Sequence, residues 1–412
     1  PPHTPTYFTT GAILLLPWNA LITPQYPHPN FSRWIPSVYL PATLLSVALL
    51  AVTALPARPR VQSGFALYAV SLFLAPLVTS LPALLSLVAV AAVADALAQG
   101  AMFGLAGQGT RPTSKRRTQS LASGTSISGI FSSLLWITTR AGLDPESNER
   151  AAFIVYFWTC AAVCGAAALV SGRWFFSSGE EGRDDDNDDD NDNETDGAIQ
   201  PRRETSRGAR ALSPLEVEAS GGGDRPTVPG VLRKAPRPLA SLVLVYWITI
   251  SISQGTRPLS EREQRQLVLT RTTAVIAHQG LQEDITRSSQ WTSAVAILLY
   301  NVSDAVGKFL EPLPVSSSAL VAASAARVLF IPAFIAAVGA NGANGAVICL
   351  LASLLGVTNG WLTITAFNAL QHDVSDQDEY LAGQVAVGAL MTGLNLGAAS
   401  SWLLMLLIRD KG

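Results

Sequence analysis

The sequence predicts an all-α polytopic membrane protein with eleven transmembrane helices. Two features of its composition indicate this class: 49% of the 412 residues are hydrophobic and only 14% are charged, whereas soluble domains contain about 25% charged residues. The third observation is that apolar runs recur along the chain, each near the roughly 20 residues that a helix needs to cross a bilayer.

The apolar runs form two groups on either side of a long polar insert. The first group covers about residues 7–23, 36–55, 61–80, 82–107, 118–139 and 151–171, and the second about 238–255, 291–314, 317–338, 345–370 and 381–408. The insert, residues 172–236, holds 15 of the 30 acidic residues, most of them from Asp184 to Asp196. Because such a composition cannot bury a core, we expect a disordered linker in preference to a calcium- or partner-binding tail. The predicted domains are residues 1–171, 172–236 and 237–412.

A proline interrupts the first apolar run. Pro17 lies within the sequence LLLPWNALITP, and a proline inside a helix removes a backbone hydrogen bond and kinks the helix. Membrane helices tolerate this where neighbours or cavity water satisfy the freed carbonyl. Trp18 and Asn19 follow directly, so the kink would direct an aromatic ring and an amide inward. The alternative is a Trp18 at the membrane boundary, where Trp is enriched.

The fourth run contains an acid at membrane depth. Asp95 and Gln99 are four residues apart and share a helix face, while Gly100 and Gly104 form a small-xxx-small pair for close helix approach. The alternative is that Asp95 is a protonated or capped carboxyl buried in packing. Residues 108–117 are expected to form a short basic loop, and the fifth run that follows is rich in Ser and Gly, which favours close packing and hydroxyl bonds between helices.

The eighth run carries the most polar stripe. Its sequence WTSAVAILLYNVSDAVGKFLEPLP places Asn301, Asp304 and Lys308 at spacings of three and four, on one helix face. Charged groups in a bilayer each cost about 3 kcal/mol or more and usually face a bundle interior or a wet cavity. The stripe therefore favours a functional site. The alternative is an Asp304–Lys308 ion pair that only fixes helix packing.

The ninth and tenth runs also contain polar residues in apolar surroundings. Arg327 lies within AARVLFIPAF, and Asn359-Gly360 lies within GVTNGWLTITAF. We expect a local helix break at Asn359-Gly360 that lines a cavity. Four scattered histidines, three cysteines and the lack of a glycine-rich phosphate loop predict no metal site, no cofactor and no ATP-driven step.

The basic residues predict the orientation. With a cytoplasmic N-terminus, the short inner loops carry six Lys and Arg residues and the short outer loops three, which follows the positive-inside rule. The long 256–290 connection carries five Arg on the outer side, against the rule. An odd number of spans then places the C-terminus outside or in a lumen, and the acidic linker in the cytoplasm. Asn30 begins a glycosylation sequon that is usable if its loop faces the exterior. The chain begins at Pro1 without Met, from which we expect a missing N-terminal segment.

Five motifs, in order, resemble the equilibrative nucleoside transporter family. Residues 16–19 (LPWN) resemble its first-helix signature, and residues 99–107 (QGAMFGLAG) its fourth-helix QGSLFGLAG. Residues 301–308 (NVSDAVGK) resemble its N-x-x-D-x-x-G-R, residues 326–332 its A-R-x-x-F-x-P, and residues 358–361 (TNGW) its SNGY. The resemblance covers nearly the whole membrane body and is closest to fungal- or plant-like members.

The resemblance implies a major-facilitator-like bundle of six plus five helices that moves nucleosides, and in some members nucleobases, by alternating access. By matching position, Trp18 and Ile22 would flank the base, Gln99 would hydrogen-bond its edge, and Asp304 with Lys308 would bind ribose hydroxyls. Asn19 and Asn301 complete the expected substrate-binding set. Structural or gating roles are expected for Pro17, Gly100, Gly104, Gly307, Arg327 and Asn359.

Two positions bear on mechanism. The family usually has Arg where this chain has Lys308. The compact ammonium of Lys on its flexible stem therefore replaces the planar guanidinium of Arg at this position. Asp95 matches an acid of plant- and fungal-like members, some of which couple to protons, so it is a candidate proton carrier.

The expected partners are a nucleoside, the lipid bilayer and, as a candidate, protons, without nucleic acid. One bundle suffices for alternating access, which favours a monomer in the plasma membrane or a vacuolar or lysosome-like membrane. The competing interpretations are a carrier of another small polar solute and a non-transporting receptor or scaffold. An enzyme is disfavoured by the lack of a nucleophile–base set.

Overall fold

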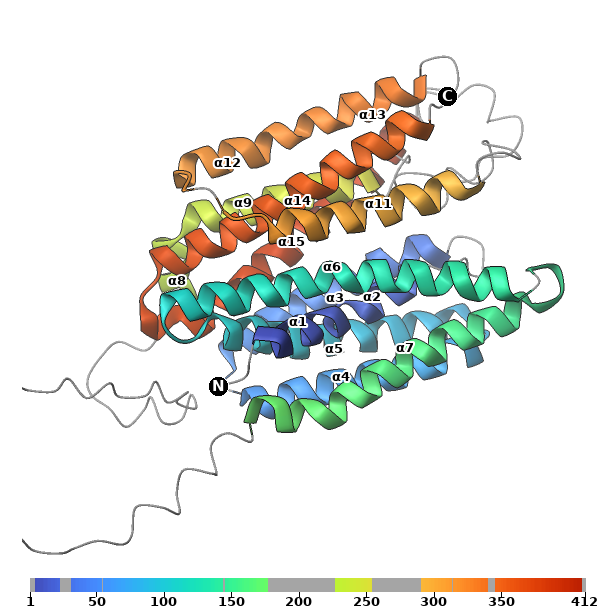
Figure 1. The fold of residues 1–412 in the computed structure, drawn as a ribbon, viewed down its shortest axis with the longest axis horizontal. Coiled ribbons are helices and arrows are strands. Elements are labelled where there is room, and N and C mark those ends of the chain that lie inside the picture. The colour runs from blue at the N-terminus through green and yellow to red at the C-terminus, as the bar shows by residue number, and fades with distance from the viewer. Residues whose placement is uncertain are drawn as a thin grey trace, which may run out of the picture.

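The chain folds into a bundle of long, roughly parallel helices (Figure 1). The computed structural model describes residues 4–22, 31–53, 55–143, 145–176, 227–253, 290–312, 314–339 and 345–409, and Asn30 lies outside them. The helices of the first half are α1 (Thr4–Leu14), α2 (Leu16–Ile22), α3 (Phe31–Val52), α4 (Ala57–Leu74), α5 (Leu81–Gly107), α6 (Arg111–Gly142) and α7 (Pro145–Phe176). Those of the second half are α8 (Val228–Lys234), α9 (Pro236–Ser253), α11 (Gln290–Phe309), α12 (Ser317–Ala326), α13 (Phe330–Gly339), α14 (Gly345–Asp373) and α15 (Glu379–Arg409). Short 3-10 turns lie at Ala75–Leu77, Arg327–Leu329 and Asp376–Asp378.

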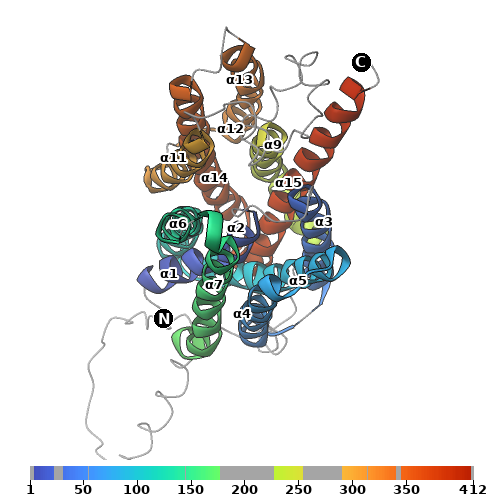
Figure 2. The ribbon, with the colours of Figure 1, turned by 90° about the vertical axis from the view of Figure 1, so that its right-hand side faces the viewer.

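The two halves of the chain lie side by side. Figures 1 and 2 show α9 and α11–α14 on one side of the bundle and α1 and α4–α7 on the other. Two seams join the halves: α6 packs on α11, and α15 packs on α5 and α3. Sites formed at either seam would therefore contain residues from both halves.

The number of spans differs from the expected eleven. Among the described residues, eight helices are long and apolar enough to cross a membrane, or nine if α8 and α9, which meet at a bend of 91°, form one span. The first expected run is split into the short helices α1 and α2 beside Pro17. In α11, the polar stripe of Asn301, Asp304 and Lys308 lowers the mean hydropathy. The count of eleven and the six-plus-five layout therefore remain predictions.

Helix boundaries differ from expectation in three places. The loop expected at 108–117 is shorter than predicted. Helix α6 already begins at Arg111, with a proline in its first turn, and it includes the basic residues that follow. The expected break at Asn359-Gly360 is wrong, because α14 is continuous from Gly345 to Asp373. The expected linker overlaps two helices, since residues 172–176 end α7 and residues 228–234 form α8. By contrast, α5 matches the expected 82–107 run within one residue.

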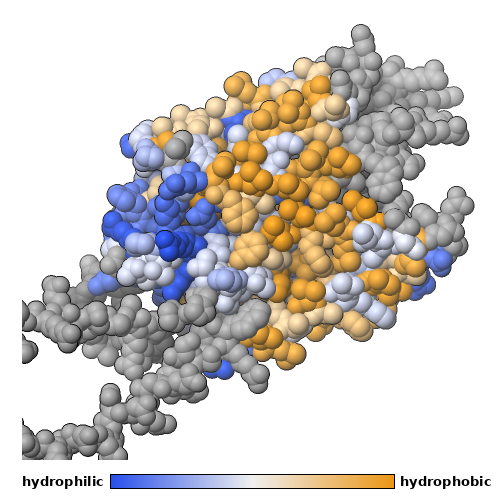
Figure 3. All heavy atoms as spheres, in the orientation of Figure 1, coloured by the Kyte–Doolittle hydropathy of each residue, from blue (hydrophilic) through white to orange (hydrophobic). Residues whose placement is uncertain are grey.

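Apolar side chains cover the outside of the bundle as well as its core. Leu45, Leu49, Leu169 and Leu329 are each more than half exposed. Figure 3 shows a broad apolar area across the face in view, with most of the hydrophilic side chains toward one end. A helix bundle that is hydrophobic on its outer surface is suited to lipid as its solvent. The surface therefore agrees with an integral, multi-pass membrane protein.

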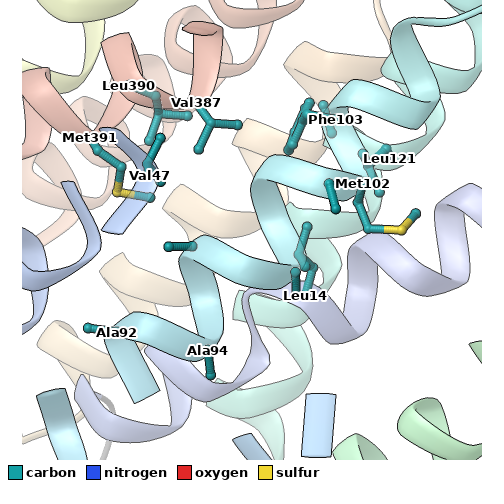
Figure 4. Packing of buried hydrophobic residues seen from close by; sticks show 14 of the residues in the cluster. Leu14, Val47, Ala92, Ala94, Met102, Phe103, Leu121, Val387, Leu390 and Met391 are labelled. Atoms are coloured by element: carbon teal, nitrogen blue, oxygen red, sulfur yellow. The ribbon is translucent and has the colours of Figure 1, made fainter. Parts of the chain in front are cut away.

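The core is built mainly from small residues and packs across both halves. Helix α5 contributes seven fully buried alanines: Ala91, Ala92, Ala94, Ala96, Ala98, Ala101 and Ala106. Figure 4 shows Val47 of α3 beside Leu390 and Met391 of α15, and Phe103 of α5 stacks on Phe367 of α14 with ring centroids 5.0 Å apart. Small residues let helix backbones approach closely where the surrounding lipid gives little hydrophobic driving force.

Candidate functional site

Close packing of α11 on α14 places the polar stripe. A side chain added at Gly307 of α11 would collide with the backbone carbonyl of Val357, and one added at Gly360 of α14 would collide with the backbone of Asp304. Only glycine permits both approaches. Gly360 therefore serves a tight helix crossing where the sequence predicted a helix break, and that crossing brings Asn359 next to Asp304.

Asp304 is held by side chains from three helices. Its Oδ2 lies 2.9 Å from the Lys308 Nζ one turn along α11 and accepts a hydrogen bond of 2.5 Å from the Ser126 Oγ of α6. Its Oδ1 accepts a bond of 2.7 Å from the Asn359 Nδ2 of α14. Asp304 and Lys308 are 5% and 4% exposed. The carboxylate is thus buried, paired with a cation and hydrogen-bonded on both oxygens.

Lys308 extends this cluster across the seam between the halves. Its Nζ donates to the Ser126 Oγ at 2.8 Å and to the Thr125 Oγ1 at 3.2 Å, both on α6. The Gln119 side chain of α6 donates to the Lys308 carbonyl at 2.9 Å. Because α6 belongs to the first half and α11 to the second, the ion pair lies at the boundary between them.

A buried chain of bonds supports Asp304 from behind. Thr249 of α9 donates to the Asn359 Oδ1 at 3.0 Å, and Arg327 donates to the Thr249 Oγ1 at 3.0 Å. Arg327 also donates to the carbonyls of Val245 and Leu355 at 2.8 and 3.2 Å. Arg327, 3% exposed, lies where α12 ends and a 3-10 turn begins. The chain of bonds ties Asp304 to α9 and α14 within the second half.

Helix α6 lies between this cluster and the first-run residues. On one face of α6, an added side chain at Gly129 would meet the Asn301 amide of α11. The Ser128 hydroxyl of the same helix accepts a bond of 2.6 Å from the Asn19 Nδ2 of α2. Trp18 packs on Tyr39 of α3, with ring centroids 4.7 Å apart, and Ile22 is half-buried. Helix α6 therefore contacts both Asn301 of the polar stripe and Asn19 of α2, through its adjacent residues Gly129 and Ser128.

Gln99 is a buried residue of α5 and does not bond to Asp304 or Lys308. It is 1% exposed, and its Oε1 has no hydrogen-bond partner among the residues that the structure describes. The two glycines that follow it face bulky neighbours. A side chain at Gly100 would meet the guanidinium of Arg60, and one at Gly104 would meet the ring of Tyr380 of α15.

Asp95 lies in a different environment, within the first half. Its Oδ1 accepts a bond of 2.5 Å from the Tyr68 hydroxyl of α4. Asp95 is fully buried, and its Oδ2 has no partner among the described residues. A buried charge is costly unless it is paired with an opposite charge. A proton on this oxygen would remove the charge of the carboxyl.

Sequence reasoning missed several members of the cluster. Ser126, Thr125 and Thr249 were not assigned individual roles, and Asn359 was expected to mark a break. The signal for Ser126 was the unusual density of serines in the fifth run, which indicated bonds between helices without identifying their partners. Among the described residues, no group of three or more His, Cys, Asp or Glu side chains comes together to hold a metal.

Comparison with known proteins agrees with the motifs. The nucleoside transporter family model matches residues 266–406, the region that contributes Asp304, Lys308, Arg327 and Asn359. Equilibrative nucleotide transporter 1 of Arabidopsis thaliana is 26% identical over 423 residues, covering 96% of this chain and 84% of that protein. Equilibrative nucleoside transporter 4 of Homo sapiens is 29% identical over 178 residues, covering 42% of this chain and 29% of that protein.

The fold is similar to that of a solved transporter. A bacterial homologue of the human lysosomal transporter Spinster, in an inward-facing and unoccupied conformation, aligns with a TM-score of 0.50 at 12% identity, covering 97% of this chain and 79% of that chain. At this identity the likeness concerns the fold alone. By its sequence the chain is similar to the equilibrative nucleoside and nucleotide transporters, which are transporters rather than enzymes, as its motifs predicted.

Proposed function

We propose that this chain transports nucleosides across a membrane and that Asp304 with Lys308 binds the ribose. The relatives are named as nucleoside and nucleotide transporters. The single observation that supports the site is the buried ion pair at the seam between α6 and α11. A carboxylate accepts and an ammonium donates, so together they fit a sugar hydroxyl, which does both.

The base would lie toward the polar and aromatic residues of the first half. Trp18 offers an aromatic face, Asn19 and Gln99 offer amides that donate and accept, and Ile22 offers an apolar contact. The unpartnered Oε1 of Gln99 supports a role in binding an amino or imino group of a base. Asn301 faces α6 between the two sets of residues.

We infer that the substrate is an uncharged nucleoside in preference to a nucleotide. Lys308 faces the seam, and Asp304 at 2.9 Å already neutralises it. A phosphate group would need a cation that is free to pair with it. The plant relatives are named nucleotide transporters, so nucleotides belong in any substrate panel.

We further propose alternating access between the two halves, which form a major-facilitator-like bundle. The seam is built from exchangeable polar bonds at Lys308 and Ser126 and from close small-residue packing, so it suits two discrete arrangements. Gly100, Gly104, Gly307 and Pro17 are the proposed structural or gating positions. The proposed location is the plasma membrane or a vacuolar or lysosome-like membrane.

Asp95 is the proposed site of proton coupling. It is buried and bonded to Tyr68, and it forms no ion pair with any residue in the described part of the chain. Such a carboxyl takes up and releases a proton more readily than it holds a lone charge in the membrane. Facilitated diffusion is the alternative, in which Asp95 only packs.

Uptake into proteoliposomes tests the proposed function. The purified chain is reconstituted and given labelled uridine, adenosine, a nucleobase, a nucleoside monophosphate and a sugar, with and without an inward proton gradient. We expect saturable uridine or adenosine uptake that is lost in Asp304→Ala. Uptake of the sugar alone would favour a carrier of another polar solute, and no uptake of any solute by folded protein would favour a receptor or scaffold.

A further inference from the structure

One side chain of the first half satisfies both members of the buried ion pair. The Ser126 hydroxyl donates to the Asp304 Oδ2 at 2.5 Å and accepts from the Lys308 Nζ at 2.8 Å. A ribose hydroxyl bound to the same pair would make the same two bonds, since a hydroxyl has one donor and two acceptor sites. Ser126 thus has the donor and acceptor pattern of the proposed ligand.

The two oxygens of Asp304 have partners of different kinds. Its Oδ1 is bonded to Asn359, which is bonded to Thr249 and through it to Arg327, all within the second half. Breaking that bond would leave the Asp304 Oδ1 and the Asn359 Nδ2 without that partner in a buried site, which costs free energy. Its Oδ2 is bonded to Lys308 on its own helix and to Ser126 from the other half. The Ser126 bond is the one that can be exchanged without disturbing the framework behind Asp304.

We propose that Ser126 occupies the position of a ribose hydroxyl and that the substrate displaces it from Asp304 and Lys308. This inference rests on the proposed nucleoside transport. The exchange replaces one charge-assisted hydroxyl bond with another, so the ion pair stays satisfied throughout. Because Ser126 belongs to α6 and the pair to α11, the exchange also removes a bond between the two halves at the moment the substrate binds.

The mechanism makes a hydroxyl on the sugar a condition for binding. A solute without a hydroxyl at this point would displace Ser126 and leave the carboxylate and the ammonium incompletely bonded, and sites that leave buried polar groups unpaired reject ligands strongly. A deoxynucleoside that lacks the exchanging hydroxyl therefore gains nothing from displacing Ser126.

Two neighbours on α6 provide matched controls. Thr125 accepts from Lys308 at 3.2 Å but donates its own proton to the Ala122 carbonyl at 2.7 Å, so its hydroxyl does not bridge the pair. Ser123 is fully buried, and its hydroxyl has no partner among the described residues. Ser123→Ala repeats the chemical change of Ser126→Ala, one turn away, without touching the pair.

The test measures equilibrium binding of labelled uridine to purified protein, together with the KM of uptake. Removal of the competing hydroxyl in Ser126→Ala is expected to lower the Kd by about three- to tenfold, whereas Ser123→Ala leaves it unchanged. The gain should vanish for whichever of 2′-deoxyuridine and 3′-deoxyuridine lacks the exchanging hydroxyl. If Ser126→Ala does not fold, Ser126→Cys keeps the size and weakens the bond, and a smaller gain is expected.

The outcomes separate this inference from the proposed function. An equal or higher Kd in Ser126→Ala, with wild-type binding and uptake intact, would overturn the displacement of Ser126 alone. An equal gain for uridine and for both deoxyuridines would also overturn it, since the effect would then not depend on a sugar hydroxyl. Wild-type protein that neither binds nor carries any nucleoside would overturn the proposed function, and this inference with it.

Discussion

Two buried carboxylates, Asp304 of α11 and Asp95 of α5, have opposite surroundings. Asp304 has a cation at 2.9 Å and hydrogen bonds on both oxygens, from α6 and α14. Asp95 has a tyrosine hydroxyl on one oxygen and no partner on the other among the described residues. Asp304 lies at the seam between the halves, whereas Asp95 lies within the first half.

Burial alone therefore does not define the role of an acidic side chain in a membrane protein. A paired, fully bonded carboxylate is suited to remain charged and to bind a polar ligand, while a carboxyl without a cation is suited to exchange a proton. The comparison therefore supports the proposed roles, substrate binding for Asp304 and proton coupling for Asp95, and each proposal can be tested by itself.

The largest effect is expected from Lys308→Ala, because it leaves Asp304 as an uncompensated buried charge. Breaking one side of a buried ion pair costs about 3–5 kcal/mol of stability, and we expect uptake to be lost. Thermal unfolding in detergent and nucleoside uptake measure the two effects. Lys234→Ala is the control, since Lys234 pairs with Asp378 but its side chain is 47% exposed. If Lys234→Ala lowered stability and uptake as much as Lys308→Ala, the claim that burial makes the Asp304–Lys308 pair more important would be contradicted.

The next effect concerns the framework behind Asp304. Asn359→Ala removes the bond to the Asp304 Oδ1 and leaves Asp304 and Thr249 with one partner fewer each. An unsatisfied buried group costs about 1–3 kcal/mol, and we expect the KM for uridine to rise by about tenfold as the carboxylate loses its orientation. An unchanged KM in folded protein would show that Asn359 does not position Asp304.

Asp95→Asn tests the other member of the comparison. The amide cannot exchange a proton, so we expect uridine uptake to persist but its stimulation by an inward proton gradient to disappear. Uptake at matched substrate concentration, with and without the gradient, measures this. Stimulation that survives in Asp95→Asn would exclude Asp95 as the carrier, and a wild-type protein without stimulation would favour facilitated diffusion.

The smallest effect is expected at the end of the bundle. Burial raises the pKa of Asp378, but the hydrogen bonds from Lys234 and Ser375 outweigh burial and hold that pKa below its usual value. The bridge therefore stabilises the protein above the unfolded pKa of about 3.9, and the contribution is lost as the pH falls through the lower folded pKa. Because Lys234 is about half exposed, Asp378→Asn should cost less than about 1 kcal/mol near neutral pH. A larger loss, or one that persists in acid, would contradict this account.

The sequence predicted individual helices better than their contacts. The bounds of α5 follow from a long apolar run ended by the residues after Gly107, and the eighth-run stripe follows from spacing alone. The partners of Asp304 did not follow, because Ser126 and Asn359 are 178 and 55 residues away along the chain. Gly360 was misjudged for the same reason. A glycine in an apolar helix suits both a break and a close crossing, and only the position of α11 decides between them.

The most direct test of the central claim replaces both members of the seam pair together. A buried ion pair exchanged for apolar residues of similar volume is often neutral for stability, so Asp304→Leu/Lys308→Met should unfold closer to wild type than Lys308→Ala does. The account predicts that this folded double variant neither binds nor takes up uridine. Uridine uptake with wild-type KM in the double variant would show that the pair only fixes helix packing, and would contradict its role in binding ribose.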